Sequence, residues 1–392
     1  MNLSIQETLV KLVRQLDRVS ETAALDAQVL LAHYLGKPRS WILAHPEARL
    51  NPAQSELVTT AAARMLHGEP LPYIIGHWEF YGLDFQLSPA VLIPRPETEL
   101  LVERGIKWLH QHPSRRQVVD VGTGSGCIGI ALAHNIPDLH ILLTDISPDA
   151  LDIARLNARK YGLQDGVELI QSDLLDGFAG PFDLVCANLP YIPTQVLKTL
   201  PVARSEPHLA IDGGDSGIDL ISRLLKQVHG HLAPGGMLLL EIEADQGPLL
   251  HAMAEDLYPL SGVHILKDLS GHDRLLEIEH SNLIVHLCPR QEWLQAQLSG
   301  SYQDASLRDT GFIHCSQPEQ LLAVANRFYA AIPDLILLWL DPEKLISPVR
   351  WEPAEGALFP HVYGPINLDA VTAVGDLMPD LDGTYRSLNP PV

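Results

Sequence analysis

Hydrophobic positions follow different spacings along the chain, and each spacing predicts a different kind of structure. Over residues 1–76 they recur every three or four residues, as Ile5, Leu9 and Leu12 do, which is typical of one face of a helix. The predicted helices run from Ile5 to Leu16, from Thr22 to Leu35 and from Pro52 to His67. We therefore expect a small helical domain that serves packing or substrate docking and has no catalytic residue set of its own.

Residues 77–94 alternate apolar and polar positions, as at Phe80, Leu83 and Phe85, which predicts a hairpin linker. Residues 95–280 then alternate short apolar runs with helical patterns. The predicted strands are 117–121, 140–145, 167–171, 183–187, 237–243, 263–267 and 274–279. The predicted helices are 127–135, 148–161, 217–232 and 246–257. This alternation predicts an α/β fold with a mostly parallel sheet, helices on both faces and a ligand at the C-terminal strand ends.

A separate α+β unit is expected over residues 283–392. It has short apolar runs at 284–287 and 335–340, a helical pattern over 318–331 and many prolines. About 110 residues are enough for an independent domain. The pattern assigns no function to this unit, which we treat as an accessory domain.

Composition and charge narrow the classes of function. The chain of 392 residues is 46% hydrophobic and 19% charged, so it can bury substantial cores. Its 48 acidic and 27 basic residues give a net charge of -21, which argues against broad non-specific binding to nucleic acid without excluding a local basic patch. No apolar stretch is long enough to span a membrane and the first residues do not resemble a leader, so we expect a cytoplasmic protein.

The cysteines and histidines do not form a metal-binding pattern. No Cys-x-x-Cys or His-Glu-x-x-His arrangement occurs, so we expect neither a zinc site nor a disulfide framework. The four cysteines are Cys127, Cys186, Cys288 and Cys315. Cys127 lies in the glycine loop and Cys186 in an apolar strand, where buried free thiols are common.

A glycine loop follows the first predicted strand and indicates a nucleotide-type cofactor. Its five residues are Gly122, Thr123, Gly124, Ser125 and Gly126. Glycine tolerates positive φ and lets the backbone approach a ligand, and the next helix presents free N–H groups. Asp145 ends the following strand, where an acid can accept hydrogen bonds from ribose hydroxyls, and Asp173 ends the third strand, where it can face an adenine edge.

Two cofactors fit this loop. Residues 124–129 match the Gly-x-Gly-x-x-Gly pattern of dinucleotide-binding proteins, which leaves a nicotinamide enzyme open. Asp120 lies two positions before the first glycine, whereas dinucleotide loops usually begin directly from apolar residues. This acid and the turn described next favour S-adenosylmethionine.

The turn Asn188-Leu-Pro-Tyr191 follows the fourth predicted strand and suits transfer to a planar nitrogen. An amide nitrogen is a poor nucleophile because its lone pair is delocalised into the carbonyl. The Asn188 side-chain oxygen and the Leu189 backbone carbonyl can accept both N–H hydrogens and oppose that delocalisation. Pro190 stiffens the turn, and Tyr191 offers a flat apolar wall. Most of the rate acceleration would then come from alignment of the substrate nitrogen with the methyl group. A plain strand-ending turn is the structural alternative.

Five segments together resemble the HemK/PrmC family of release factor N5-glutamine methyltransferases over residues 1–280. They are Leu92-Ile-Pro-Arg-Pro-Glu-Thr-Glu99, Asp120-Val-Gly-Thr-Gly-Ser-Gly-Cys-Ile128, Thr144-Asp-Ile-Ser147, Asn188-Leu-Pro-Tyr-Ile192 and Ser205-Glu-Pro-His-Leu-Ala-Ile-Asp-Gly-Gly-Asp-Ser-Gly217. The resemblance implies a class I methyltransferase whose substrate is the glutamine of the Gly-Gly-Gln motif in peptide chain release factors.

The same resemblance implies roles for individual residues. Residues 122–126, Asp145 and Asn188 would bind S-adenosylmethionine, and residues 188–191 would hold the glutamine amide. Leu174 stands where relatives often place a larger side chain against the adenine. We expect Arg95, together with two nearby glutamates at positions 97 and 99, to shape the active-site entrance and contact substrate.

Leu189 departs from the family, which usually has proline at this position. Because the proposed role belongs to a backbone carbonyl, leucine can still perform it with a less rigid turn. The form Asn-Leu-Pro-Tyr also resembles the motif of ribosomal RNA adenine N6-dimethyltransferases. The Pro-Arg-Pro-Glu run and the acidic charge speak against an RNA substrate. Methylation of another protein glutamine is a further alternative.

The C-terminal unit resembles domain-of-unknown-function family 952 instead. The resemblance rests on Ile284-Val-His-Leu287, Gly311-Phe-Ile-His-Cys-Ser316, Trp351-Glu352 and Phe359-Pro-His-Val-Tyr-Gly364, among other segments. Its polar residues among apolar neighbours either line a pocket or form hydrogen-bonded core positions. These residues are His286, His314, Glu352 and His361. We assign no reaction to them.

Overall fold

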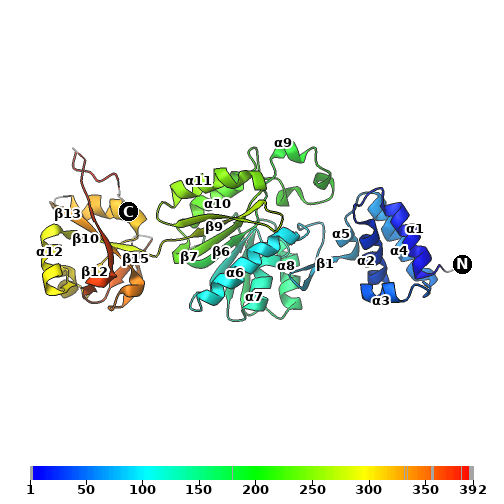
Figure 1. The fold of residues 1–392 in the computed structure, drawn as a ribbon, viewed down its shortest axis with the longest axis horizontal. Helices are drawn as coiled ribbons and strands as arrows, with labels where there is room; N and C mark the ends of the chain where they lie inside the picture. The colour runs from blue at the N-terminus through cyan, green and yellow to red at the C-terminus, as the bar shows by residue number, and fades with distance from the viewer. Residues whose placement is uncertain are drawn as a thin grey trace. The chain divides into compact units, whose positions relative to one another are not determined.

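The computed structural model describes residues 3–178, 180–330, 332, 334–354, 357–380 and 382–387. The chain forms two compact units, Met1–Glu279 and His280–Val392, which are drawn as a ribbon in Figure 1. Within the described residues, no helix is long and apolar enough to cross a membrane.

The first unit begins with a helical bundle whose ends are capped by local chemistry. Ser4 and Asn51 accept the N3 backbone N–H of the first and fourth helices, and Gly36 ends the second helix in the left-handed conformation. The helices are α1 (Ile5–Leu16), α2 (Ala23–Leu35), α3 (Arg39–Ala44), α4 (Pro52–Leu66) and α5 (Leu71–Ile75). The three helices predicted from spacing are confirmed, whereas α3 and α5 are too short to show a period.

An antiparallel hairpin connects this bundle to the sheet domain. It consists of β1 (His77–Phe80) and β2 (Leu83–Gln86), so the predicted hairpin is confirmed. The Gln86 backbone N–H donates to Asn157 Oδ1 at 2.7 Å, which attaches the hairpin to the sheet domain. A short turn η1 (Pro96–Thr98) and helix α6 (Glu99–Gln111) follow. Helix α6 was not among the predicted helices.

A seven-stranded sheet has the order β5-β4-β3-β6-β7-β9-β8. The first five strands in this order are parallel, and β9 is antiparallel to both of its neighbours. The strands are β3 (Gln117–Val121), β4 (His140–Asp145), β5 (Val167–Gln171), β6 (Phe182–Ala187), β7 (Leu232–Glu241), β8 (Gly262–Lys267) and β9 (Asp273–Glu279). The prediction of a mostly parallel α/β sheet is confirmed.

Helices cover both faces of this sheet, as Figure 1 shows. Successive strand residues alternate between two cores: Val118 packs with α6, α7 and α8, whereas Val119 packs with α10 and α11. The long helices after α6 are α7 (Cys127–Asn135), α8 (Pro148–Lys160), α10 (Asp219–Val228) and α11 (Gly247–Leu257). Short helical segments lie between β6 and α11: α9 (Thr194–Leu197), η2 (Pro201–Arg204), η3 (His208–Ala210) and η4 (Ala244–Gln246).

The strand register brings four connecting segments to one edge of the sheet. Val121, the last residue of β3, pairs with Thr144 of β4 on one side and with Ala187 of β6 on the other. Ala187 pairs in turn with Leu240 of β7. The segments that follow β3, β4, β6 and β7 therefore begin side by side at the carboxyl edge, where ligands of open parallel sheets bind.

The second unit is smaller and richer in strands. Its sheets have the orders β10-β13-β17, β11-β16 and β12-β15-β14. The strands are β10 (Ile284–Pro289), β11 (Ser301–Tyr302), β12 (Ile313–His314), β13 (Leu335–Leu340), β14 (Val349–Ala354), β15 (Ala357–Val362), β16 (Ile366–Asn367) and β17 (Val371–Asp376). The two strands predicted here are confirmed as parts of β10 and β13.

The helices of the second unit are short. They are α12 (Arg290–Ser299), α13 (Ala305–Asp309), η5 (Pro318–Gln320), α14 (Leu321–Val324), η6 (Ala325–Tyr329), η7 (Pro342–Lys344) and η8 (Leu368–Ala370). The single helix predicted over 318–331 is wrong in detail. Its first turn is a 3-10 turn that begins at Pro318, and its last described turn is a π-helix, so one regular period is not maintained.

Candidate active site

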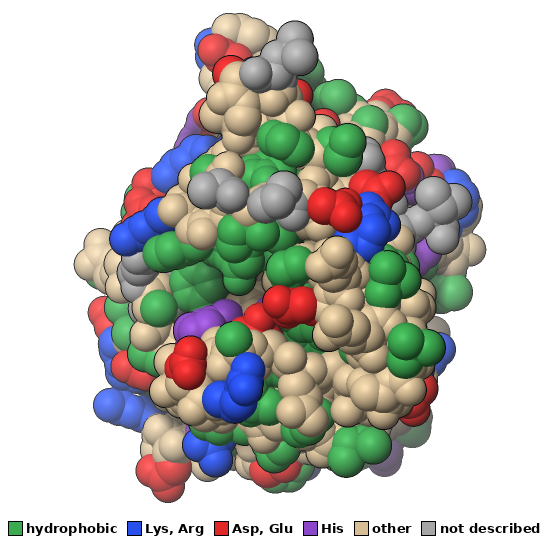
Figure 2. All heavy atoms as spheres, turned by 90° about the vertical axis from the view of Figure 1, so that its left-hand side faces the viewer, with side chains coloured by type: hydrophobic (Ala, Val, Ile, Leu, Met, Phe, Trp, Pro, Cys, Tyr) green, Lys and Arg blue, Asp and Glu red, His purple; other side chains and the backbone are tan. Residues whose placement is uncertain are grey.

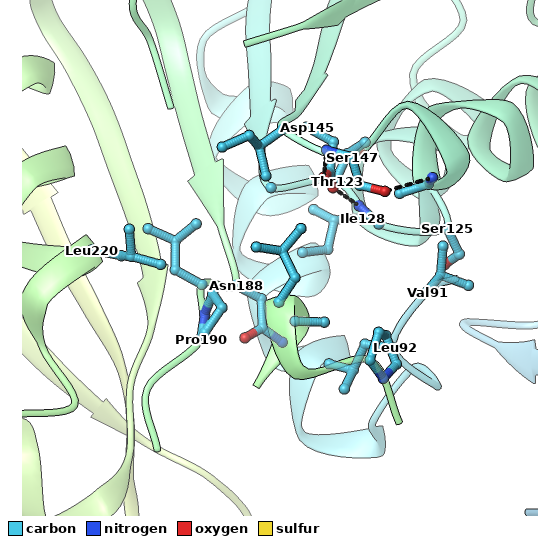
Figure 3. A pocket seen from close by; sticks show the side chains of 18 of the residues that line it. Val91, Leu92, Thr123, Ser125, Ile128, Asp145, Ser147, Asn188, Pro190 and Leu220 are labelled. Carbon is cyan, nitrogen blue, oxygen red and sulfur yellow. Dashed lines mark hydrogen bonds between the residues drawn. The ribbon is translucent and has the colours of Figure 1, made fainter. Parts of the chain in front are cut away.

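A cavity opens at the carboxyl edge of the seven-stranded sheet. Its walls come from the segment after the hairpin, the glycine loop, the ends of β4, β5 and β6, the turn η3 and helix α10. Among its lining residues are Val91, Leu92, Arg95, Thr98, Gly122, Thr123, Gly124, Ser125, Asp145, Ser147, Asp173, Leu174, Asn188, Leu189, Pro190, Leu209 and Arg223. In Figure 3, Asp145, Thr123 and Ser147 lie toward one end of the cavity, and Asn188 and Pro190 lie toward the other.

The glycine loop adopts a backbone that side chains would obstruct. Gly122 has φ +70°, and a Cβ there would lie 2.9 Å from Leu189 Cδ2. Gly126 has φ +82°, and a Cβ there would lie 2.7 Å from Ile130 Cδ1. Both positions therefore favour glycine for its positive φ, and a Cβ at either one would also displace the end of a neighbouring side chain. The first four loop residues line the cavity, whereas Gly126 is placed behind them at the start of α7.

Asp120 supports the loop from inside the protein. Its Oδ2 accepts the Thr123 hydroxyl at 2.6 Å and the Gly129 backbone N–H at 3.0 Å. Its other oxygen, Oδ1, has no hydrogen-bond partner among the described residues. Burial raises the pKa of this carboxyl to about 6 against the opposing effect of these two donors. Asp120 therefore holds the loop's shape without lining the cavity.

Asp145 joins the loop to the end of β4. Its Oδ2 accepts the Gly124 N–H at 2.8 Å and its Oδ1 accepts the Ser147 N–H at 2.9 Å. Burial raises the pKa of Asp145, while these backbone donors lower it. Each carboxylate oxygen can accept a further hydrogen bond, so the two oxygens can accept from the two hydroxyls of a vicinal diol such as that of a ribose. The donor and acceptor set therefore fits the adenosyl part of S-adenosylmethionine.

The third acid and its neighbour also line the cavity. Asp173 Oδ2 accepts from Arg223 Nη2 at 2.8 Å, so this carboxylate is held by a side chain of α10. Leu174 is buried and has φ +56°, a left-handed conformation that is unfavourable for a leucine. Strained backbone of this kind is often found at ligand sites, because the surrounding structure must impose it.

The Asn188 turn brings an amide to the opposite end of the cavity. Asn188 Nδ2 donates to Thr98 Oγ1 at 3.1 Å, and no described residue donates to Asn188 Oδ1. Leu189 is buried with its side chain against Gly122, and it lines the cavity together with Pro190. The turn thus presents an acceptor oxygen beside the glycine loop.

Tyr191 lies differently from the wall expected from the sequence. It is not among the residues that line the cavity, and its ring packs against the core between the sheet, α10 and α11. Its hydroxyl donates to Glu241 Oε1 at 3.5 Å, and burial raises the tyrosine pKa. Gln246 Nε2 donates to the Tyr191 carbonyl at 3.0 Å and holds the end of the turn.

Of the three charged residues expected at the entrance, only Arg95 lines the cavity. Its guanidinium pairs with the buried carboxylate of Glu206, whose other oxygen accepts the Ile93 N–H at 3.1 Å. Glu97 is exposed, and Glu99 accepts the backbone N–H of a tyrosine in the hairpin at 2.9 Å. The Arg95 pair therefore fastens the segment before α6 to the loop after β6.

Four polar residues of this region were not predicted from the sequence, namely Thr98, Glu206, Arg223 and Glu241. Thr98 ends η1 directly before α6 and precedes Leu101 and Val102 by three and four residues, so its place in line with the buried face of α6 could have been found from helical spacing. The roles of the other three depend on contacts between distant segments. No local pattern reports such contacts.

In the second unit, the four polar residues named from the sequence divide into two groups. His286 is a hydrogen-bonded core residue: its Nδ1 is 2.7 Å from the His314 carbonyl oxygen and its Nε2 is 3.0 Å from a tyrosine hydroxyl. His361 Nδ1 lies 2.6 Å from Glu352 Oε2, and both are partly exposed, while His314 is exposed. Figure 2 shows a face with histidine and acidic side chains in a hollow beside hydrophobic ones.

Family models match three parts of the chain. The model described as the PrmC N-terminal domain matches residues 7–76, and the one described as a methyltransferase small domain matches residues 97–257. The model described as a protein of unknown function (DUF952) matches residues 287–374.

Individual relatives extend this result. The release factor glutamine methyltransferase of Moorella thermoacetica is 42% identical over 275 residues, which cover 69% of this chain and 97% of that protein. The one of Escherichia coli is 36% identical over 265 residues, 67% of this chain and 92% of that protein. An X-ray structure of a Caulobacter crescentus protein is 35% identical and covers 26% of this chain and 93% of that chain, with a TM-score of 0.26.

The parallel sheet, the glycine loop with its acids and the Asn188 turn define a class I S-adenosylmethionine-dependent methyltransferase. With relatives at this identity and coverage, the chain belongs to the family of release factor glutamine methyltransferases. The resemblance noted from sequence motifs is confirmed. The relatives do not favour the RNA adenine alternative, and S-adenosylmethionine rather than a nicotinamide is the cofactor.

Proposed function

We propose that this protein transfers a methyl group from S-adenosylmethionine to the side-chain nitrogen (N5) of the glutamine in the Gly-Gly-Gln motif of peptide chain release factors. The observation that carries the proposal is the Asn188 amide. Its amino group donates a hydrogen bond to Thr98. Its oxygen therefore stays available as an acceptor in the cavity that the glycine loop also lines. A primary amide is the kind of group that this acceptor can orient.

The cofactor end would be formed by the glycine loop and two acids. Asp145 would accept hydrogen bonds from the ribose hydroxyls, and the glycine-rich backbone of residues 122–126 would let the polar part of the cofactor approach closely. Asp173 and Leu174 would contact the adenine, with Arg223 fixing the carboxylate. When bound, S-adenosylmethionine supplies a sulfonium methyl: the S–C bond breaks as the N–C bond forms, and S-adenosylhomocysteine remains.

The acceptor end would prepare the glutamine nitrogen. Asn188 Oδ1 and the Leu189 backbone carbonyl would accept its two N–H hydrogens, which draws the lone pair away from the substrate carbonyl and aligns it with the methyl. After transfer, the nitrogen releases one proton to water and is left as a neutral N-methyl amide. Alignment of this kind can supply several kcal/mol of the barrier reduction, on the order of 7–11 kcal/mol in well-oriented systems.

The remaining regions would serve the same reaction. Residues 1–76 would dock the release factor, residues 77–94 would link this domain to the methyltransferase domain over 95–280, and Arg95 would contact the substrate at the entrance. Pro190 would stiffen the turn. Tyr191 would support it from the core side rather than as an open wall. Residues 283–392 would form an accessory domain without a role in the transfer.

The test is methyl transfer from labelled S-adenosylmethionine to a purified release factor. The matched control is the same factor with Gln→Ala in its Gly-Gly-Gln motif. We expect label on the unmodified factor and none on the control. Equal labelling of both would place the methyl elsewhere, and absence of label on both with cofactor binding intact would contradict the proposed substrate.

A further inference from the structure

Glu241 is a buried carboxylate at the acceptor end that the proposed reaction does not yet use. It is the last residue of β7, and Leu240 before it pairs with Ala187, the residue before Asn188. Asn188 and Glu241 therefore leave neighbouring parallel strands at the same level. Glu241 is 1% exposed, and its Oε2 has no hydrogen-bond partner among the described residues. A buried carboxylate with this little support is costly to the fold.

The groups around Glu241 are those that hold the Asn188 turn. Burial raises the pKa of Glu241 to about 7, and the Thr98 hydroxyl and Arg274 act most strongly in the opposite direction. Tyr191 donates to Oε1 at 3.5 Å. Thr98 is itself buried and accepts the Asn188 amino group at 3.1 Å. Thr98 therefore contacts the Asn188 amide, which would face the substrate, and also interacts with the Glu241 carboxylate.

Hydrogen-bond direction links these three side chains. A hydroxyl has one proton to donate, so a Thr98 that accepts from Asn188 Nδ2 must send its own proton elsewhere. An ionised Glu241 is an acceptor only and attracts that proton. A protonated Glu241 can donate to Thr98 instead, which frees the hydroxyl to donate to Asn188 and favours the flipped amide. The flipped amide would present N–H groups to the substrate N–H groups.

We propose that Glu241 is a positioning residue that, through Thr98, keeps the Asn188 oxygen directed at the substrate amide. This inference rests on the proposed function and deepens it. It makes methyl transfer depend on the ionisation of a side chain that does not line the cavity. Transfer should therefore fall as pH drops through the range in which Glu241 gains its proton.

Other charged groups act on Glu241, so their influence on the pH dependence of transfer must be distinguished from that of Glu241 itself. Arg274 of β9 attracts it and is held by Asp268 at 3.3 Å, and Glu97 of η1 repels it. Glu243, two residues further on, acts on both Tyr191 and Arg274. Glu243 is exposed and accepts its hydrogen bond within η4, so Glu243→Gln is a matched control that changes a nearby charge and keeps the cap.

The first experiment compares pH profiles of kcat/KM for a release factor, from about pH 5.5 to about pH 9, in the wild type, Glu241→Gln and Glu243→Gln. For the wild type and the control we expect a one-proton acid limb centred near pH 7. For Glu241→Gln we expect kcat to fall about 30-fold at high pH, with the limb absent and the Kd of S-adenosylmethionine within about twofold. An unchanged limb in Glu241→Gln would overturn the proposal.

If Glu241→Gln folds poorly, variants of Thr98 test the same relay through the hydroxyl. Thr98→Ser retains the hydroxyl and should retain the acid limb, whereas Thr98→Val should lose it with a similar fall in kcat. Equal profiles for the two variants would contradict the relay through the hydroxyl.

A second readout needs no methyl acceptor and separates this inference from the proposed function. The NMR signal of the Asn188 side-chain amino group should shift with one proton near pH 7 in the free wild-type enzyme and stay constant in Glu241→Gln. If this signal titrates while no release factor is methylated, only the proposed substrate fails. A signal that is independent of pH in the wild type would overturn the role of Glu241.

Discussion

The two ends of the cavity satisfy their polar groups in opposite ways. At the cofactor end, both oxygens of Asp145 accept backbone N–H groups, at 2.8 and 2.9 Å. At the acceptor end, Asn188 and Glu241 rely on side-chain hydroxyls, and one Glu241 oxygen has no partner among the described residues. The backbone thus preorganises the first end, whereas side chains set the second. Substitutions should accordingly change cofactor affinity at one end and turnover at the other.

The largest effect is expected for Asn188→Ala. This change removes the acceptor oxygen but leaves the glycine loop and Asp145 in place. Turnover should fall by about 10³-fold, comparable to the loss of an oriented hydrogen-bonding group in other active sites. The Kd of S-adenosylmethionine, measured by calorimetry, should stay within about threefold. Retained turnover would contradict the role of this amide.

Asp145→Asn should weaken the binding of S-adenosylmethionine and leave turnover at saturating cofactor nearly unchanged. The amide has one acceptor atom where the carboxylate has two, so one of the ribose hydroxyls would lose its acceptor when the cofactor binds. An unsatisfied group of this kind costs about 1–3 kcal/mol, which corresponds to a Kd for S-adenosylmethionine raised about 10- to 100-fold. At saturating cofactor, kcat should approach the wild-type value. A kcat loss as large as that of Asn188→Ala would remove the distinction between the two ends.

Glu241→Gln should reveal what the acceptor end costs in stability. Because the pKa of Glu241 is raised from 4.5 to about 7, the folded protein keeps a proton that the unfolded chain loses in this interval. Its free energy of unfolding therefore falls as pH rises through this window. The variant lacks this dependence, so its stability relative to wild type should increase by on the order of 3 kcal/mol between low and high pH. Denaturant titrations of both proteins across this range give the measurement, and parallel curves would contradict it.

The smallest effect is expected for Leu189→Pro. The proposed acceptor at this position is the backbone carbonyl, which proline retains, and a second proline would stiffen the turn. The variant also loses the contact between the Leu189 side chain and Gly122. Turnover should be equal to the wild type or up to about threefold higher. A large loss would show that the turn depends on this leucine side chain.

Local patterns were sufficient for the elements that build the cofactor end. The apolar run of β3, the glycines after it and the start of α7 are all marked within a few consecutive residues. Helix α6 was not predicted because Gly105 interrupts its helical spacing of apolar residues. A Cβ at this glycine would lie 3.0 Å from Leu132 Cδ2 of α7, so the two helices approach closely here. Similarly, β7 begins at Leu232 rather than 237 although Pro234 and two glycines in its first half are typical of loops.

The acceptor end was predictable only in part. Asn188 could be named because its turn is a short motif with its own chemistry. Thr98 and Glu241 could not be paired with it, because their contacts join the turn η1 to β7 and to the turn after β6 across long stretches of sequence. In the sequence, Glu241 ends an apolar run and is followed by two further acids within four residues, so nothing distinguishes it from an exposed charge. Its burial is a property of the sheet's register.

The most direct test of the account locates the transferred methyl group by fragmentation mass spectrometry. A release factor would be incubated with the enzyme and S-adenosylmethionine, digested, and its Gly-Gly-Gln peptide sequenced in the mass spectrometer. We expect one methyl group on the side-chain nitrogen of that glutamine, present with wild-type enzyme and absent with Asn188→Ala. A methyl group on any other residue, or an equal yield with Asn188→Ala, would contradict it.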